Sequence, residues 1–188
     1  MHIFVHALKH LHISYYRMFV IQSYFCIPMF KQLTKEQAIQ KLKHYCAYQE
    51  RSHSEVREKL FQLKIWKKDQ DEIIAYLIEN DYLNEERFAI SYASGKLRIK
   101  HWGRMKIKQG LLTKFIPKKI IQTALYSFED EEYERIFKQL AERKWKDLDR
   151  EKDPWQKKAK LMRFLQSRGF EQEMIYSVFE SLSHLDNR

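Results

Sequence analysis

The chain of 188 residues contains little glycine, proline or cysteine: four, three and two residues respectively. A many-stranded sheet needs frequent tight turns built from glycine, asparagine or proline, so this scarcity favours helices joined by short polar loops. Cys26 and Cys46 are too few for a disulfide framework and lack metal-ligand spacing, which predicts a reducing, cytoplasmic location. The 44% hydrophobic and 14% aromatic shares are typical of a folded chain.

Acidic residues are missing from one long stretch, between Arg87 and Phe128. Ten cations fall there: Arg87, Lys96, Arg98, Lys100, Arg104, Lys106, Lys108, Lys114, Lys118 and Lys119. They equal the formal net charge of +10, so the rest of the chain is neutral. Such a block attracts phosphates or an acidic protein surface. The alternative is a merely solvated lysine-rich helix, but solvated helices usually mix both signs of charge.

Motifs for catalysis are also missing. The sequence has no glycine-rich phosphate loop, no HExxH and no nucleophile elbow. Its acidic run at 129–134 is interpreted as the solvated N-terminus of a helix, because carboxylates are favoured there. We therefore expect a protein that is not an enzyme and that has no cofactor and no metal site.

Residues 1–32 form an atypical extension, apolar and aromatic, without any acid. A signal peptide and a membrane span are both disfavoured because polar residues interrupt the apolar run. Translation starting at Met29 is one interpretation, and an ordered or membrane-surface extension remains the other. His2, His6 and His10 have helical spacing that could chelate a metal, but we expect no site there.

From Thr34 onward the apolar pattern is helical and repeats. A pair of apolar residues spaced i and i+4 recurs about every fifty residues, and each pair is followed by another apolar side chain. The three sets are Val56, Leu60 and Ile65; Ile107, Leu111 and Ile116; and Leu161, Leu165 and Phe170. Such periodicity indicates stacked modules. We predict an all-α fold, an elongated tandem array of three three-helix repeats resembling helix-turn-helix modules, with repeats at 33–83, 84–128 (basic) and 129–188.

Residues 80–116 resemble the signature of the RecX family of recombinase regulators. The matching residues of its first part are Tyr82, Leu83, Arg87, Phe88 and Ala89. Asp81 stands where the family commonly has glycine, and Arg104 replaces the usual proline. The resemblance implies a cytoplasmic regulator that binds the RecA recombinase filament on DNA and inhibits strand exchange and the coupled ATP hydrolysis.

Partner or DNA contact is expected from the basic block: Lys96, Arg98, Lys100, Arg104, Lys106 and Lys108, with lower weight on Lys114, Lys118 and Lys119. The signature is interpreted as structural, with Tyr82, Leu83 and Phe88 filling the seam between the first two repeats and Glu86 or Arg87 forming an ion pair. Trp102 is interpreted as packing.

Two other functions remain open. A helical module could bind DNA directly, without a recombinase, since three-helix units resemble helix-turn-helix domains. A membrane-surface role for residues 1–30 is the third possibility. We expect a monomer without stable membrane association.

Overall fold

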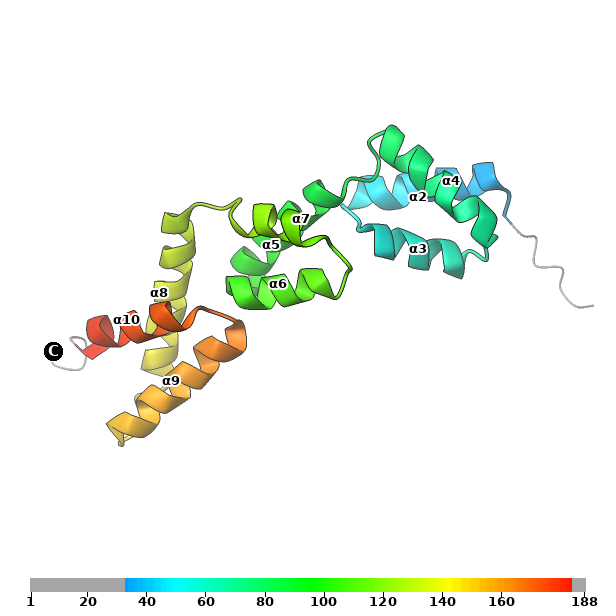
Figure 1. Cartoon of the computed structure of the whole chain (residues 1–188). Coiled ribbons are helices and arrows are strands. Elements are labelled where there is room, and N and C mark those ends of the chain that lie inside the picture. The colour runs from blue at the N-terminus through cyan, green and yellow to red at the C-terminus, as the bar shows by residue number, and fades with distance from the viewer. Residues whose placement is uncertain (1–32, 184–188) are drawn as a thin grey trace, which may run out of the picture. The chain divides into compact units, whose positions relative to one another are not determined.

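The computed structural model describes residues 33–183, which form nine α-helices and no strand (Figure 1). The first module holds α2 (Lys35–Tyr48), α3 (His53–Gln62) and α4 (Lys67–Glu79). The second holds α5 (Glu85–Lys100), α6 (Arg104–Leu112) and α7 (Lys118–Leu125). The third holds α8 (Asp130–Asp147), α9 (Pro154–Arg168) and α10 (Gln172–Ser183). The all-α prediction and the tandem arrangement are confirmed for these residues.

Local sequence sets where the helices begin. Thr34 and Ser52 each form a capping box, in which the hydroxyl accepts the N–H of the third helical residue and that residue's side chain bonds back. Asn84 caps α5 by accepting the Arg87 N–H at 2.9 Å. Asp153 caps α9, whose first residue is proline. Each cap satisfies an amide that the helix leaves unpaired, so short helices can begin at these positions.

The first two modules repeat with a constant spacing of 51 residues. Buried residues of α2, α3 and the loop after α3 correspond to buried residues of the second module in six pairs: Ala38 and Ala89, Leu42 and Ala93, Cys46 and Leu97, Val56 and Ile107, Leu60 and Leu111, Ile65 and Ile116. The chain after each middle helix also turns in the same way. Lys64, Phe115 and Gly169 have φ values of 56°, 61° and 83°, the left-handed region that commonly terminates helices.

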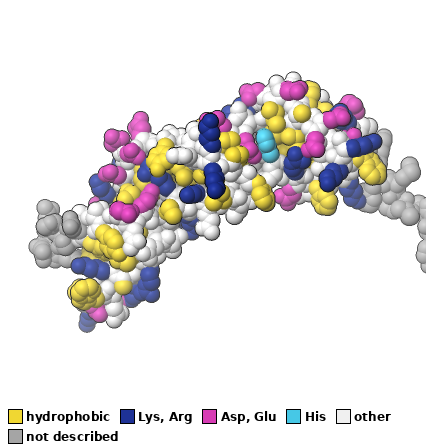
Figure 2. All heavy atoms as spheres, in the orientation of Figure 1, with side chains coloured by type: hydrophobic (Ala, Val, Ile, Leu, Met, Phe, Trp, Pro, Cys, Tyr) yellow, Lys and Arg dark blue, Asp and Glu magenta, His cyan; other side chains and the backbone are white. Residues whose placement is uncertain are grey.

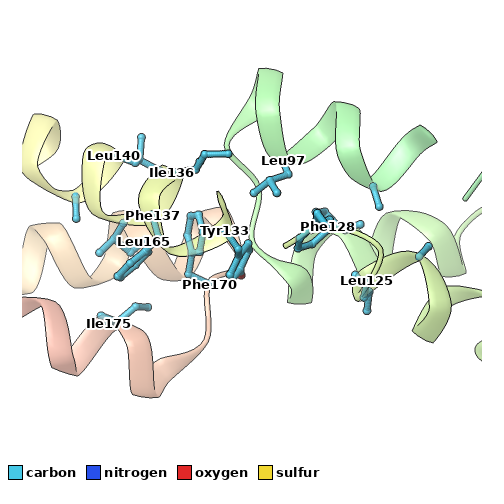
Figure 3. Packing of buried hydrophobic residues seen from close by; sticks show 14 of the residues in the cluster. Leu97, Leu125, Phe128, Tyr133, Ile136, Phe137, Leu140, Leu165, Phe170 and Ile175 are labelled. Carbon is cyan, nitrogen blue, oxygen red and sulfur yellow. The ribbon is translucent and has the colours of Figure 1, made fainter. Parts of the chain in front are cut away.

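One continuous apolar cluster joins the second and third modules, from Phe88 to Leu182. Figure 3 shows Tyr133, Phe137 and Phe170 turned toward one another between α8, α9 and α10. The ring of Phe170 lies 5.7 Å from that of Tyr133 and 5.0 Å from that of Phe137, between ring centroids. None of the buried residues before Phe88 belongs to this cluster, so the first module packs around its own side chains.

The middle helices of successive modules meet end to end. The N–H groups of Gly103 and Met105, at the start of α6, donate to the carbonyls of Arg168 and Gly169 at the end of α9, at 2.9 and 3.1 Å. In the same way the Ser54 hydroxyl of α3 donates to the Lys114 carbonyl just after α6, at 3.0 Å. At the α6–α9 junction, amides without a partner in their own helix are satisfied by carbonyls of the next one. At both junctions the positive end of one helix dipole meets the negative end of another, which is favourable.

Candidate partner-binding surface

Arg98, predicted to contact a partner, is exposed but forms an ion pair with an acid of the next module. Its Nε and Nη2 atoms each donate to one carboxylate oxygen of Glu132, both at 2.9 Å. This pair links α5 of the second module to α8 of the third. The hydrogen bond raises the pKa of Arg98 and lowers the pKa of Glu132. A phosphate or a partner's carboxylate would have to compete with this bidentate pair for the guanidinium.

Arg104 also has a structural role. Its side chain is only 17% exposed. The guanidinium lies 4.2 Å from the centroid of the Tyr133 ring and donates to Asp130 at 2.6 Å and to the Leu125 carbonyl at 3.2 Å. The Arg104 amide N–H donates to the Tyr133 hydroxyl at 3.0 Å, and that hydroxyl donates to Glu171 at 2.6 Å. Burial and the bond to Glu171 raise the pKa of Tyr133, so the group stays a neutral donor.

Two further lysines of the block bond within the chain. Lys106 donates to the Ser167 carbonyl at 2.8 Å, at the carboxyl end of α9 where a cation is favoured. Lys114 pairs with Glu55 of the first module. These two lysines therefore strengthen the same end-to-end contacts that the backbone makes.

The acidic run at 129–134 supplies two of these partners. Asp130 pairs with Arg104 and Glu132 with Arg98, so interpreting the run only as a solvated helix start was wrong in part. The acid-free stretch in the sequence is not an acid-free surface, because neutralising carboxylates come from the modules on either side.

Lys96 lies between two aromatic rings. Its Nζ atom is 5.0 Å from the centroid of the Tyr92 ring and 4.9 Å from that of Trp102. Lys106 approaches the same indole at 5.0 Å. Trp102 is half-buried and packs against the main apolar cluster, in agreement with its interpretation as a packing residue.

The remaining cations of the block point to solvent. Lys100, Lys108, Lys118 and Lys119 are exposed, and none forms an ion pair with an acid in residues 33–183. Lys and Arg side chains appear among apolar ones around the centre of the face in Figure 2. Together with half-buried Lys96, which forms no ion pair with an acid in this range either, these four lysines are the cations of the block that are available to a partner.

A comparison of modules singles out Lys118 and Lys119. They open α7, whose first turn contains no acid. At the corresponding positions, Lys67 and Lys68 open α4, where Asp69 follows in the first turn. A cation at a helix N-terminus is unfavourable by about 0.3–1 kcal/mol because the helix dipole is positive there. The second module thus retains an unfavourable local charge that no described acid offsets, as functional positions often do. A helix that opens with two lysines and no acid is the sequence signal for this charged position.

The signature residues lie at the junction of the first two modules. Leu83, Phe88 and Ala89 are buried, and Tyr82 is half-buried with the Lys43 ammonium 5.1 Å from its ring centroid. Phe88 belongs to the cluster of the later modules and Leu83 does not. The two side chains therefore serve different cores instead of filling one seam.

Arg87 connects those cores, and Glu86 is exposed. Arg87 donates to Glu50, in the loop after α2, and to both the carboxylate and the carbonyl of Asp81, at 2.8 and 2.9 Å. Asp81 itself has a φ of 57°. Glycine favours that left-handed backbone and aspartate tolerates it, which accounts for an aspartate at the position where the resemblance would place glycine.

Residues 33–183 contain neither a candidate metal cluster nor a candidate membrane span. No group of three or more His, Cys, Asp or Glu side chains there is arranged to hold a metal ion. None of the helices in this range is long and apolar enough to cross a bilayer. His2, His6, His10 and the alternative start at Met29 lie outside the described residues.

Two family models match the chain. The model of the second three-helix domain of RecX matches residues 84–125, and that of the third matches residues 130–179. A regulatory protein RecX from Serratia proteamaculans is 35% identical over 60% of this chain, and one from Lactococcus lactis subsp. lactis is 33% identical over 74%. The crystal structure of RecX from Lactobacillus salivarius superposes with a TM-score of 0.71 at 27% identity, covering 79% of this chain and 96% of that one.

Those matches and the tandem three-helix modules define a helical-repeat protein of a regulatory class. The chain belongs to the RecX family. It spans 65% of the length of the Serratia relative and 52% of the length of the Lactococcus relative.

Proposed function

We propose that this protein binds a RecA-type recombinase filament on DNA in the cytoplasm and lowers its ATP hydrolysis and strand exchange. It acts as a regulator and not as an enzyme, with DNA contacted without sequence preference. Membership of the RecX family, whose curated relatives are named regulatory proteins, is the observation that carries the proposal.

The charge distribution supports contact through the second module. Lys100, Lys108, Lys118 and Lys119 are exposed and have no acidic partner among the described residues. The partner is a polyanion coated with protein, so cations in one module can meet phosphate, carboxylate or both. Arg98, Arg104, Lys106 and Lys114 hold the modules together instead, and we assign them a positioning role.

Titration of DNA-dependent ATP hydrolysis by the cognate recombinase tests the proposal. Wild-type protein is expected to inhibit hydrolysis, and Lys100→Glu/Lys108→Glu/Lys118→Glu/Lys119→Glu is expected to need a roughly tenfold higher concentration or more. The matched control is Lys67→Glu/Lys68→Glu, which reverses the corresponding lysines of the first module. Arg104→Glu is unsuitable, because it would place a carboxylate beside Asp130 and Glu171.

Direct DNA binding is the competing outcome of this experiment. Tight, saturable binding to duplex DNA that survives competitor DNA and requires no recombinase would favour an independent DNA-binding module. Equal inhibition by the wild-type protein and the variant with four reversed charges would show that the contact lies elsewhere.

A further inference from the structure

An open groove runs beside α5, at the junction of the first and second modules. Its volume is about 390 Å³. Tyr92, Lys96 and Ile99 of α5 line one side, and Glu50 and Glu55 of the first module line the other. None of the residues that form ion pairs between the second and third modules lines this groove. Its lining includes one glycine.

No contact among the described residues requires a glycine at position 95. It lies in the interior of a sixteen-residue helix, where glycine is less favourable than alanine. A Cβ atom added at Gly103, Gly110 or Gly169 would come within 2.4 Å of another atom, whereas one at Gly95 would meet nothing within 4 Å. The corresponding residue of α2 is His44, so the first module has no such gap. A missing side chain in an open groove lets another backbone approach closely.

The charges of the groove are of two kinds. The carboxylates of Glu50 and Glu55 are already paired, with Arg87 and Lys114 respectively. Lys96 and Lys100 form no ion pair with an acid in residues 33–183; Lys96 instead contacts the Tyr92 and Trp102 rings. The groove can therefore receive negative charge at its α5 side.

An apolar side chain accompanies these lysines. Ile99 lines the groove and is 74% exposed. A nucleic-acid backbone carries a charge at every nucleotide, so it could not confine its phosphates to the lysine side, away from Glu50 and Glu55, and it would offer the isoleucine no apolar partner. A peptide can place carboxylates on the lysines, an apolar side chain on Ile99 and its own main chain over Gly95. The lining thus favours peptide over nucleic acid.

We propose that the groove along α5 binds an acidic peptide segment with an apolar anchor, belonging to the recombinase, whose backbone passes over Gly95. This inference rests on the proposed function and specifies its contact: carboxylate, not phosphate, meets Lys96 and Lys100. The exposed lysines of α6 and α7 remain available to DNA.

Substitution of Gly95 tests the groove with little risk to the fold, because a larger side chain meets no described atom at its Cβ. Gly95→Leu fills the gap, and Gly95→Ala is the matched control that leaves most of it open. Each variant is titrated against the assembled filament, by ATP hydrolysis and by sedimentation with the filament, and against the same single-stranded DNA without recombinase.

Gly95→Leu is expected to weaken filament binding roughly tenfold or more, while Gly95→Ala and all binding to bare DNA stay at the wild-type level. An equal loss on bare DNA would assign the groove to nucleic acid and overturn the inference. Unchanged filament binding by Gly95→Leu would overturn it too, leaving the proposed function intact. A wild-type protein without any effect on the filament would remove both.

Discussion

Gly103 and Gly169 touch through their backbones, and neither position has room for a side chain. A Cβ on Gly103 would lie 2.3 Å from the carbonyl oxygen of Gly169, and a Cβ on Gly169 would lie 2.4 Å from the Cβ of Lys106. The hydrogen bonds from Gly103 to Arg168 and from Met105 to Gly169 depend on this approach. Two glycines far apart in the sequence therefore define the junction of the second and third modules.

Gly103→Ala should destabilise the protein by about 1–3 kcal/mol, because backbone atoms must move apart to admit one methyl group. Urea unfolding followed by circular dichroism measures the change. Free energies of unfolding equal to that of the wild type would show that the end-to-end helix contact is not tight in solution.

Gly95→Ala should have the opposite effect, although the substitution is the same. Its methyl group enters open space, and alanine is favoured over glycine in a helix interior by about 1 kcal/mol. We expect a higher free energy of unfolding and a melting temperature raised by a few degrees, about 2–4 °C for a chain of this size. A decrease would mean that Gly95 has a packing neighbour that the fold does not show.

Lys118→Glu/Lys119→Glu should stabilise the protein while weakening inhibition of the recombinase. Placing acids in the first turn of α7 favours the helix dipole, by about 1 kcal/mol in total. Chemical unfolding and the ATPase titration, measured on one preparation, separate the two effects. The expected result is a trade-off between stability and function. Loss of both together would indicate damage to the fold.

Acid should remove the contribution of the Arg98–Glu132 pair. The pKa of Glu132 is lowered in the folded protein, so the pair stabilises above the ordinary glutamate pKa of about 4.3. That contribution is lost as pH falls through the lower, folded value. The free-energy gap between wild type and Arg98→Met should therefore be constant near neutrality and close in the acidic range.

Unfolding at a series of pH values measures that gap. The control is Lys138→Met, whose partner Glu134 lies one turn earlier on the same exposed face of α8, so its effect should be small at every pH. If the free-energy gap between wild type and Arg98→Met stays unchanged down to strongly acidic pH, the ion pair does not stabilise the junction.

Local signals made the helices predictable. The capping boxes at Thr34 and Ser52 and the i, i+4 apolar pairs act within one turn, so the sequence alone places them. Val56, Leu60, Ile107 and Leu111 are fully buried, as the pattern predicted. Even the glycine that ends α9 follows a known rule, since glycine is the usual left-handed residue after a helix.

The roles of the cations could not be read locally. Arg98 and Glu132 are 34 residues apart in the sequence. Arg104 pairs with Asp130 of α8 and with Glu171, which directly precedes α10. Nothing in the basic stretch distinguishes these arginines from Lys100 or Lys108. Only the packing of the third module on the second decides which charges are neutralised, and packing of this kind depends on contacts between distant residues.

The separate core of the first module has a consequence for cooperativity. Apolar burial is the main source of cooperative unfolding, and the buried residues before Phe88 share no cluster with those after it. Residues 33–83 should therefore open as an independent unit, with amide exchange faster than in the rest of the described chain. A ligand seated beside Glu50, Glu55 and α5 would tie that unit to its neighbour. Slowed exchange in α4, which contributes no residue to the groove, would then report occupancy at a distance from the ligand itself.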